Sequence, residues 1–390
     1  MRSQVKIITI VAGFLMLASF NSVIAQRPTP TPRPRPQPKN LNAGAVYVLT
    51  NQVKNAIAAF QRAADGSLTA AGEFSTGGAG DPVAIPPDPP TDPLASQGAL
   101  VFGSGNRFLF GVNAGSNQIS VLRVDRASLD LVDVVDSGGV RPISLTAHEN
   151  LLYVLNEGGT PNITGFTIGG DGTLTPLAGS TQPLIGGTAA DPAQVSFNGD
   201  GTLLVVTEKL GNRIDTYPVD ENGVAGAPIE NSSSGMTPFG FSFNNSDFLI
   251  VSEAFGGTPN LAAVSSYDSD EAGILSTISG SVPNSQTASC WVVIPNDGRL
   301  AVVSNTGSGT ISTYDIEDDG VLTLANAVAA DLGLKSAPRD MALSVNSQFL
   351  YVQMEGGESV AMFSIEQDGS LAPIGTVGGL PFGAQGIAAK

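Results

Sequence analysis

Two glutamates stand where they could move a proton. Glu208 and Glu253 each end a short apolar run, at a point where similar runs in the chain end in asparagine, for example Asn156 and Asn305. If two carboxylates converge in a partly dry site, their pKa values rise, and one of them can donate or accept a proton near neutral pH. Asparagines at the same level can hydrogen-bond to a substrate, so Asn156 and Asn305 are candidate binding residues.

Cations and further polar groups lie close to these runs or open other segments. Lys209 and Arg213 follow Glu208, and two alternating segments begin with Pro338-Arg339-Asp340 and Pro192-Ala193-Gln194. Arg339 can hold a carboxylate or stabilise an oxyanion, and Asp340 adds a third acid for proton transfer. Lys209, Arg213 and Gln194 complete the candidate binding residues. The alternative is a hydrogen-bonded polar ring that only satisfies strand ends around a watery channel.

Composition excludes several other chemistries. His148 is the only histidine and Cys290 the only cysteine among 390 residues. A multi-histidine metal site and an intramolecular disulfide are therefore ruled out, and a Ser/His/Asp triad is not expected because His148 lies in the segment Ala147–Asn150 between two predicted strands, on the face away from the candidates. No loop has the ligand spacing of a calcium site, and no glycine-rich phosphate loop precedes a helix. We expect neither a metal nor a cofactor.

The candidates belong to a repeat of about 50 residues. A strand-like run such as Val46–Asn51 or Phe349–Met354 recurs seven times, followed each time by a Gly/Asn loop and an alternating strand. A turn, in several copies Asp-Gly as at Asp65-Gly66, then leads to another strand. Glycine there supplies the positive φ that a two-residue hairpin needs. Four short strands per repeat, without helical periodicity, predict an all-β fold, a seven-bladed β-propeller with four-stranded blades.

The two ends of the repeat predict how the ring closes. The first copy lacks a preceding strand, because a proline-rich segment comes directly before Val46. A spare strand of that kind, Phe382–Ala389, follows the seventh copy. The C-terminal strand should join the first blade and close the ring, which removes the open edges of a row of blades. A long two-domain β-sandwich is the structural alternative.

The predicted ring gives the candidates a common location. First strands line the central channel, and one face, here called the top, carries the connections from second to third strand and from each blade to the next. The candidates should lie near the channel mouth on this face. The proline-rich connection Gly78–Gly98 enters on the same face, where it can cover the mouth or form an inert surface loop.

The N-terminal segment predicts export. Residues 1–25 combine a cationic start, an apolar run of 14 residues (Ile7–Phe20) and a small-residue cleavage site, as in a signal peptide. Residues 26–43 form a proline-rich linker, and residues 44–390 form the propeller. We expect a secreted or periplasmic protein without a transmembrane span in its mature form. An uncleaved anchor followed by a stalk is the alternative.

Charge restricts the partners. All six basic residues before position 41 stand without an acid, and the other 12 basic residues face 35 acidic ones, so the last 350 residues carry a net charge of −23. Nucleic-acid binding is excluded, because proteins that bind phosphate backbones concentrate Lys and Arg. A small-molecule substrate or another extracellular ligand remains, and we expect a monomer.

The repeated run FLYV-x-N, the Gly/Asn loop, the alternating strand and DG-x-L-T resemble the lactonase-type seven-bladed propellers over nearly all of 44–390. This family includes bacterial 6-phosphogluconolactonase and the carboxymuconate-lactonizing enzymes. The resemblance implies Arg and Glu at the channel mouth and a histidine after Pro-Arg on an inner strand. Pro338-Arg339 matches, whereas Asp340 stands in the place of the histidine, and Glu208 or Glu253 matches the acid. The sequence YVLTN also looks like the short-repeat propellers of microbial surfaces, which bind rather than catalyse.

Two hypotheses follow. The first is an exported lactonase-like propeller that opens or closes the lactone ring of an unphosphorylated sugar acid or aromatic acid. Arg339 would hold the carboxylate, and Glu208, Glu253 or Asp340 would move the proton. A phosphorylated sugar lactone is disfavoured, because it is a cytoplasmic metabolite and the negative field would repel it. The second hypothesis is a non-catalytic binding or scaffold propeller tethered by the linker.

Overall fold

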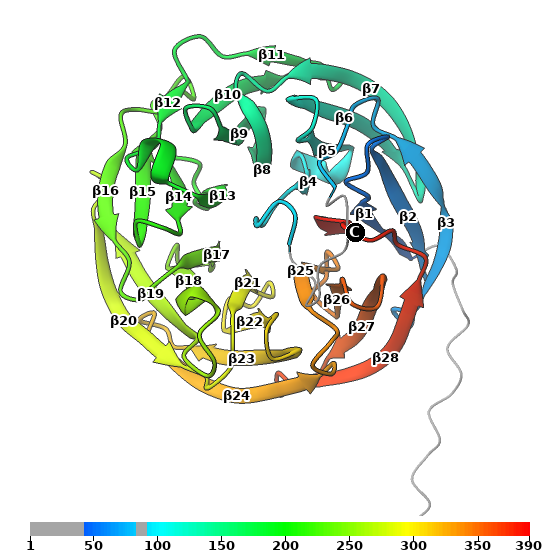
Figure 1. Cartoon of the computed structure of the whole chain (residues 1–390), viewed down its shortest axis with the longest axis vertical. Helices are drawn as coiled ribbons and strands as arrows, with labels where there is room; N and C mark the ends of the chain where they lie inside the picture. Colours follow the sequence, from blue (N-terminus) through cyan, green and yellow to red (C-terminus); the bar gives the residue numbers. More distant parts are fainter. Residues whose placement is uncertain (1–42, 83–91) are drawn as a thin grey trace, which may run out of the picture. The chain divides into compact units, whose positions relative to one another are not determined.

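A computed structural model of the chain describes residues 43–82 and 92–390. The predicted signal peptide and residues 26–42 of the linker lie outside the described residues. The strands form seven blades arranged in a ring, as expected from the repeat (Figure 1). No helix among the described residues is long and apolar enough to cross a membrane.

Each blade is an antiparallel sheet whose first strand lies at the channel and whose last strand lies outside (Figure 1). From the inside outward, blades 1 to 4 contain β29 (Ile387–Ala389), β1 (Gly44–Leu49), β2 (Ala56–Arg62) and β3 (Leu68–Ser75); β4 (Leu100–Phe102), β5 (Phe108–Asn113), β6 (Gln118–Asp125) and β7 (Ser128–Asp136); β8 (Val140–His148), β9 (Leu151–Gly158), β10 (Asn162–Ile168) and β11 (Leu174–Pro176), with β12 (Gln182–Pro183) also pairing with β10; and β13 (Pro192–Phe197), β14 (Leu203–Glu208), β15 (Arg213–Pro218) and β16 (Ile229–Ser232). Blades 5 to 7 contain β17 (Pro238–Phe243), β18 (Leu249–Glu253), β19 (Ala263–Ser269) and β20 (Leu275–Pro283); β21 (Ser289–Val293), β22 (Leu300–Asn305), β23 (Thr310–Ile316) and β24 (Leu322–Asp331); and β25 (Pro338–Leu343), β26 (Phe349–Met354), β27 (Ser359–Ile365) and β28 (Leu371–Gly378). Three short 3-10 helices lie in the connections, η1 (Ser104–Asn106), η2 (Gly187–Ala189) and η3 (Phe255–Gly257).

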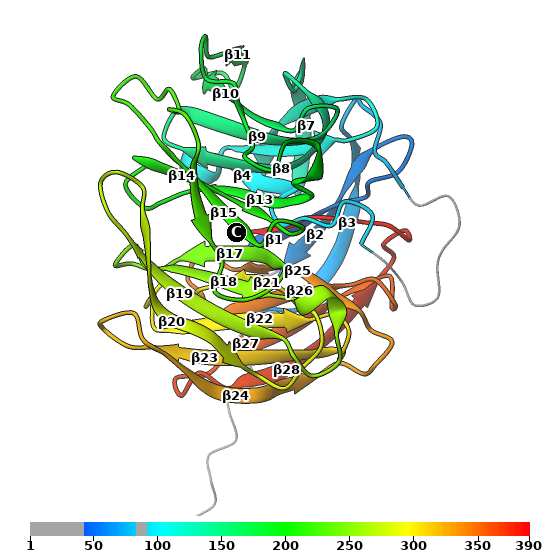
Figure 2. The ribbon, with the colours of Figure 1, turned by 60° about the vertical axis from the view of Figure 1, so that its left-hand side comes forward.

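The core lies between the blades. Buried side chains of β14 and β15 in blade 4, among them Val205 and Ile214, pack against Phe241 and Tyr267 of blade 5. Tyrosine hydroxyls add hydrogen bonds across the same kind of interface; the Tyr153 hydroxyl, for example, donates to the carbonyl of Gly223 at 2.7 Å. Figure 2 shows the blades stacked in this way around the ring. Side chains of the middle strands therefore face the next blade rather than the channel.

The Asp-Gly turns form as the sequence predicts. Gly66 has φ +82°, and the carboxylate of Asp65 accepts a hydrogen bond from the backbone N–H of Ser67. A Cβ at Gly66 would lie 2.4 Å from the ring of Phe349 in blade 7, so glycine is required here for space as well as for φ. The turns thus contribute to the contact between blades on the face opposite the mouth.

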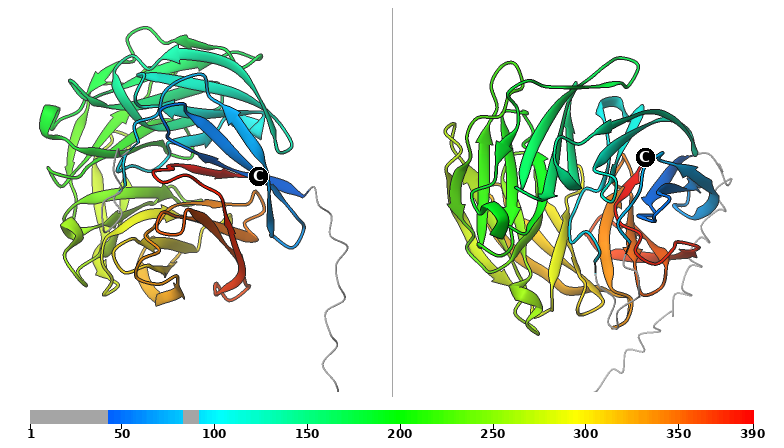
Figure 3. Two further views of the ribbon diagram at one scale, coloured as in Figure 1. Left: turned by 45° about the vertical axis from the view of Figure 1, so that its right-hand side comes forward. Right: turned by 45° about the horizontal axis from the view of Figure 1, so that its top comes forward.

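Closure by the C-terminal strand is confirmed. β29 pairs antiparallel with β1, with Val46 opposite Ala389 and Val48 opposite Ile387 (Figure 3, left). The strand is shorter than the expected Phe382–Ala389, because Gly383 and Gly386 adopt φ values of +83° and +86°, which interrupt an extended strand. Blade 1 is therefore built from both ends of the described chain.

Candidate functional site

Bulges in the inner strands shape the mouth of the channel. The pairing of first and second strands shifts register just inside the top of blades 3 to 7, at Pro142/Ser144, Pro192/Gln194, Pro238/Phe241, Ser289/Trp291 and Pro338/Met341. Proline is the first residue of β13, β17 and β25 and the third residue of β8, and it is tolerated there because an inner edge strand has no partner on its channel side. A bulge re-aims the side chains beside it. In blade 7 the bulged residues are Arg339 and Asp340.

The channel is filled by part of the connection between blades 1 and 2. The segment Asp92–Gly98, which we call the plug, leads into β4 from the centre of the ring (Figure 1). Gln97 donates its backbone N–H to the Ala193 carbonyl in blade 4 at 3.1 Å, and its side-chain amide makes two hydrogen bonds with the backbone of Val292 in blade 6. In blade 3 the Ser144 hydroxyl donates to the Gln97 carbonyl at 2.6 Å.

The inner strands are also shaped around the plug. Gly240 in blade 5 lies so close to it that a Cβ there would be 2.1 Å from Oε1 of Gln97. The indole N–H of Trp291 and the Gln385 amide both donate to the Ser96 carbonyl, at 3.0 Å each. Withdrawing the plug would leave many buried partners unpaired at about 1–3 kcal/mol each. The plug is therefore a permanent part of the fold.

Two buried cations lie around the upper end of the plug. Arg339 is fully buried, and its NH1 atom lies 3.1 Å from Oε2 of Glu355. The Lys209 ammonium lies 3.1 Å from Oδ1 of Asp191 and donates to the carbonyls of Ala95 and Pro192, both at 2.9 Å. Burial lowers the pKa of Lys209, and Asp191 opposes this shift.

Asp92, the first residue of the plug, completes this group. Its Oδ1 accepts hydrogen bonds from the backbone N–H groups of Leu94 and Ala95, at 3.1 and 2.9 Å. Burial raises the pKa of the Asp92 carboxyl, and the charges of Arg339 and Lys209 oppose the rise. We call the five residues Asp92, Asp191, Lys209, Arg339 and Glu355 the mouth cluster. It combines two cations with three acids, the groups that oxyanion stabilisation and proton transfer require.

Asp340 and Gln194 lie below the plug. Both line a cavity of about 270 Å³ together with Gln97 and Gly98. The Asp340 carboxylate accepts from the backbone N–H of Met341 at 2.9 Å and from that of Gly98 at 3.4 Å, and burial raises its pKa to about 7. Gln194 exchanges two hydrogen bonds with the backbone of Phe241 in the next blade. The plug separates these two candidates from Glu355 and Asp191, because its own backbone contacts Asp340.

The residues at the ends of second strands hold the incoming connections. In blade 5, Glu253 accepts hydrogen bonds from Gly235 N–H at 2.8 Å, from Ser265 at 2.5 Å and from Ser281 at 2.6 Å, and burial raises its pKa. In blade 4, Glu208 accepts from Gly186 N–H at 2.9 Å and from Arg213 NH1 at 3.3 Å. The counterparts in blades 3 and 6 anchor their connections in the same way, Asn156 to the Ser137 carbonyl and Asn305 to the Asn284 amide.

This arrangement corrects the expectation that Glu208 and Glu253 converge at the mouth. Each carboxylate is fully buried inside its own blade, because side chains of second strands face the adjacent connection and the next blade. Arg213 also lies in the blade 4 anchor and pairs with Glu230 at 2.7 Å. Of the sequence candidates, the structure brings Arg339 and Lys209 together at the mouth. Three residues of the mouth cluster were not among the sequence candidates, namely Asp92, Asp191 and Glu355. The proline-rich connection did indicate a segment over the mouth.

Blade 4 has one further acid next to its anchor. Asp215 occupies the place that a hydroxyl residue takes beside the anchors of blades 2, 5 and 6, where Ser120, Ser265 and Ser312 contact the anchoring side chain. Its Oδ2 accepts from Ile185 N–H at 2.9 Å, while Oδ1 is buried without a hydrogen-bond partner among the described residues. Burial and Glu208 raise the pKa of Asp215 to about 8. Near neutral pH Asp215 therefore keeps its proton, which it can donate in a hydrogen bond to the neighbouring Glu208.

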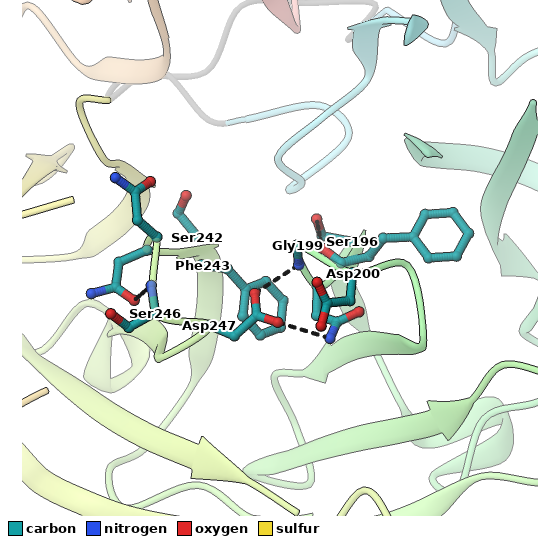
Figure 4. A pocket seen from close by; sticks show the side chains of 11 residues that line it. Ser196, Gly199, Asp200, Ser242, Phe243, Ser246 and Asp247 are labelled. Atoms are coloured by element: carbon teal, nitrogen blue, oxygen red, sulfur yellow. Dashed lines mark hydrogen bonds between the residues drawn. The ribbon is translucent and has the colours of Figure 1, made fainter. Parts of the chain in front are cut away.

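The opposite face carries a separate, polar depression between blades 4 and 5 (Figure 4). Its volume is about 740 Å³, and the Asp247 carboxylate there accepts from Gly199 N–H at 2.8 Å and from Asn198 Nδ2 at 3.1 Å. His148 lies on the same face beside the ring of Phe197. Within the part of the chain that the structure describes, no three metal-binding side chains gather. None of the sequence candidates lines this depression.

Comparisons with known proteins agree with this architecture. The sequence matches the family described as "Lactonase, 7-bladed beta-propeller" over residues 101–256 and 260–385. A 6-phosphogluconolactonase of Yersinia pestis is 23% identical over 266 residues, which cover 65% of this chain and 75% of that protein. One of Serratia proteamaculans is 24% identical over 267 residues, covering 65% and 76%. The solved periplasmic gluconolactonase of Pseudomonas aeruginosa is 16% identical, covers 88% of this chain and 98% of its own, and superimposes with a TM-score of 0.64. At that identity the likeness shows the fold alone.

Proposed function

Because the chain belongs to the lactonase family of seven-bladed β-propellers, we propose that it opens or closes a lactone ring at the mouth of its channel. The observation that supports this reaction is the mouth cluster, in which Arg339 and Lys209 are buried among three carboxylates. Opening a cyclic ester places negative charge on the carbonyl oxygen, which nearby cations stabilise. A carboxylate can accept the proton of the attacking water.

The substrate of this proposal is the lactone of an unphosphorylated sugar acid or aromatic acid. Three acids face two cations in the mouth cluster, and the last 350 residues carry −23. A phosphate group would therefore meet an unfavourable potential. The Yersinia and Serratia relatives are named for a phosphorylated lactone, whereas the Pseudomonas structure is named for gluconolactone and for the periplasm. Export by residues 1–25 is part of the proposal and agrees with an unphosphorylated substrate.

The role of Arg339 changes in this proposal. Its side chain is fully buried behind Glu355, so it does not hold a substrate carboxylate directly. Its positive charge acts on the mouth from inside the protein, because the low dielectric of the interior screens electrostatic interactions only weakly. A ligand approaches from above the plug, where Asp92 and Asp191 are only half-buried. The plug forms the floor of this shallow site.

One observation favours a second candidate, a non-catalytic binding propeller. The Lys209 ammonium has three acceptors within the protein, and both oxygens of Glu355 are occupied, by Arg339 and by Gly383 N–H. In this second candidate, the paired charges have the purely structural role of holding the plug in place. Such a protein would bind a ligand on its top face without converting it.

A lactone panel separates the two candidates. The secreted chain is assayed for acid release from unphosphorylated aldonolactones and aromatic lactones, and for the reverse ring closure. Lys209→Met and Arg339→Met test the mouth cluster, while Arg299→Ala is the control, since its exposed pair with Asp318 lies on the opposite face. We expect turnover that both mouth variants reduce and the control retains. Absence of turnover together with calorimetrically measured lactone binding would establish the second candidate, and absence of both would refute the site.

A further inference from the structure

Asp92 and Asp191 are the two partly exposed acids of the mouth cluster, and of these Asp92 forms no ion pair within the described residues. It is half-buried at the upper end of the plug, with Oδ1 fixed by the Leu94 and Ala95 N–H groups. Its Oδ2 has one long contact, 3.4 Å to the Gln385 amide, and keeps the capacity to accept a proton. Resting on the proposed function, we infer that Asp92 is the catalytic base of the lactonase reaction and takes over the role of the missing histidine.

The other acids are excluded by their positions. Asp340, which follows Pro338-Arg339 where the family has a histidine, lies below the plug and is held by Gly98. Glu355 is 2% exposed and has both oxygens occupied. Asp191 is the counterion of Lys209, and that pair would have to break before Asp191 took a proton. The connection between blades 1 and 2 thus places an acid at the mouth that none of the inner strands supplies in an unpaired, partly exposed form.

The surroundings of Asp92 fit a base. Desolvation makes the carboxylate more basic than one in water, while Arg339 and Lys209 keep its ionised form accessible. The two turn hydrogen bonds fix the direction of the carboxylate, so no reorganisation is needed when the proton moves. The same two cations lie within electrostatic reach of the oxyanion that forms beside Asp92.

The reaction step balances with water as the second reactant. Asp92 takes one proton from a water molecule while the water oxygen forms a bond to the lactone carbonyl carbon. The tetrahedral intermediate then collapses by breaking the bond between this carbon and the ring oxygen. Asp92 returns its proton to the ring oxygen, which becomes the hydroxyl group of the open hydroxy acid. The other hydrogen of the water stays on the new carboxyl group, which ionises in solvent.

Asp92→Asn tests the inference with little structural change, because the asparagine Oδ1 can still accept from Leu94 and Ala95. We expect kcat for the best lactone of the panel to fall about 100-fold or more, with KM and melting temperature nearly unchanged. The wild-type rate should decline as the pH falls through the pKa of Asp92, and this limb should be absent in the variant. Asp331→Asn is the matched control, since Asp331 is exposed and accepts a similar turn bond from Gly333 at 2.9 Å.

A second variant separates catalysis from structure. Asp92→Ala should be inactive, and added formate should restore at least a tenth of the wild-type rate by supplying a carboxylate. Wild-type kcat in Asp92→Asn would overturn the inference and leave the proposed function standing. If Asp92→Ala is inactive and formate does not restore the rate, the role of Asp92 is structural and the inference is overturned as well. A wild-type chain that turns over no lactone would instead overturn the proposed function itself.

Discussion

Replacing Asp215 by asparagine should remove a large pH dependence of stability. In the native protein the raised pKa keeps Asp215 protonated near neutral pH, and Asp215 and Glu208 anchor the connection into blade 4 through Ile185 and Gly186. Asparagine has the same shape as the protonated acid. Its oxygen can accept from Ile185 N–H, and its amide can donate to Glu208 at every pH.

The magnitude follows from the two pKa values of Asp215. The ordinary value is 3.8, and the folded value is about 8. At pH values between these two pKa values, the native state binds one more proton than the unfolded chain. The free energy of unfolding therefore falls by about 1.4 kcal/mol for each unit by which the pH rises. From pH 5 to pH 8 one full proton amounts to roughly 4 kcal/mol. Above the folded pKa, Asp215 is ionised in both the native and the unfolded state, and this loss is complete.

Urea unfolding of both proteins between pH 5 and pH 8.5 measures the effect. The difference between the two curves isolates Asp215, since all other titrating groups are common to both. We expect similar stability near pH 5 and an asparagine variant that is more stable by several kcal/mol near pH 8. Asp215→Ser, which introduces the residue found beside the anchors of blades 2, 5 and 6, should also flatten the curve. Parallel curves for wild type and Asp215→Asn would refute the raised pKa of Asp215.

Three further predictions concern the ring and the mouth. Deleting Phe382–Lys390 removes β29 and should lower the melting temperature by more than about 10 °C in circular dichroism, whereas an unchanged melting temperature would contradict closure. Gln97→Ala leaves the N–H and C=O of Val292 unpaired in the channel and should cost about 2–4 kcal/mol in urea unfolding; a cost below 1 kcal/mol would mean that the plug is loosely held. Glu355→Gln removes the carboxylate that pairs with the buried Arg339 at 3.1 Å and should lower the free energy of unfolding by about 1–3 kcal/mol, and the double variant with Arg339→Met should recover most of this loss; additive losses would contradict the coupling.

The repeat made the architecture predictable, because each strand type carries its own local signal. The run Phe349–Met354 coincides with β26, and the run Val46–Asn51 overlaps β1. Glycine at positive φ marked the hairpins, and the missing first strand of blade 1 marked the closure. The strands and hairpins depend on hydrogen bonding between residues that are close in the sequence, and the closure follows from the number and order of strands in the repeat.

The orientation of the polar side chains was not predictable in this way. The position of Glu208 at a strand end is evident from the sequence, but the direction of its side chain depends on how adjacent blades stack. The path of Asp92–Gly98 depends on distant partners, such as the glycine at position 240 that leaves room for Gln97. Local sequence patterns do not indicate which residues, far apart in the chain, will fit against one another. For this reason Arg339 and Lys209 were identified, while Asp92 was not.

Pairing of β29 with β1 determines when the protein can complete its folding. Blade 1 contains the first residues of the ring and also the last, since Val46 pairs with Ala389. During synthesis or transport, β1 exposes an unpaired edge to which a strand of another chain can add. Contacts between such distant residues also form slowly. The ring therefore closes only after the whole chain has been made. A chaperone that covers the unpaired edge of β1 until then would protect the chain from aggregation.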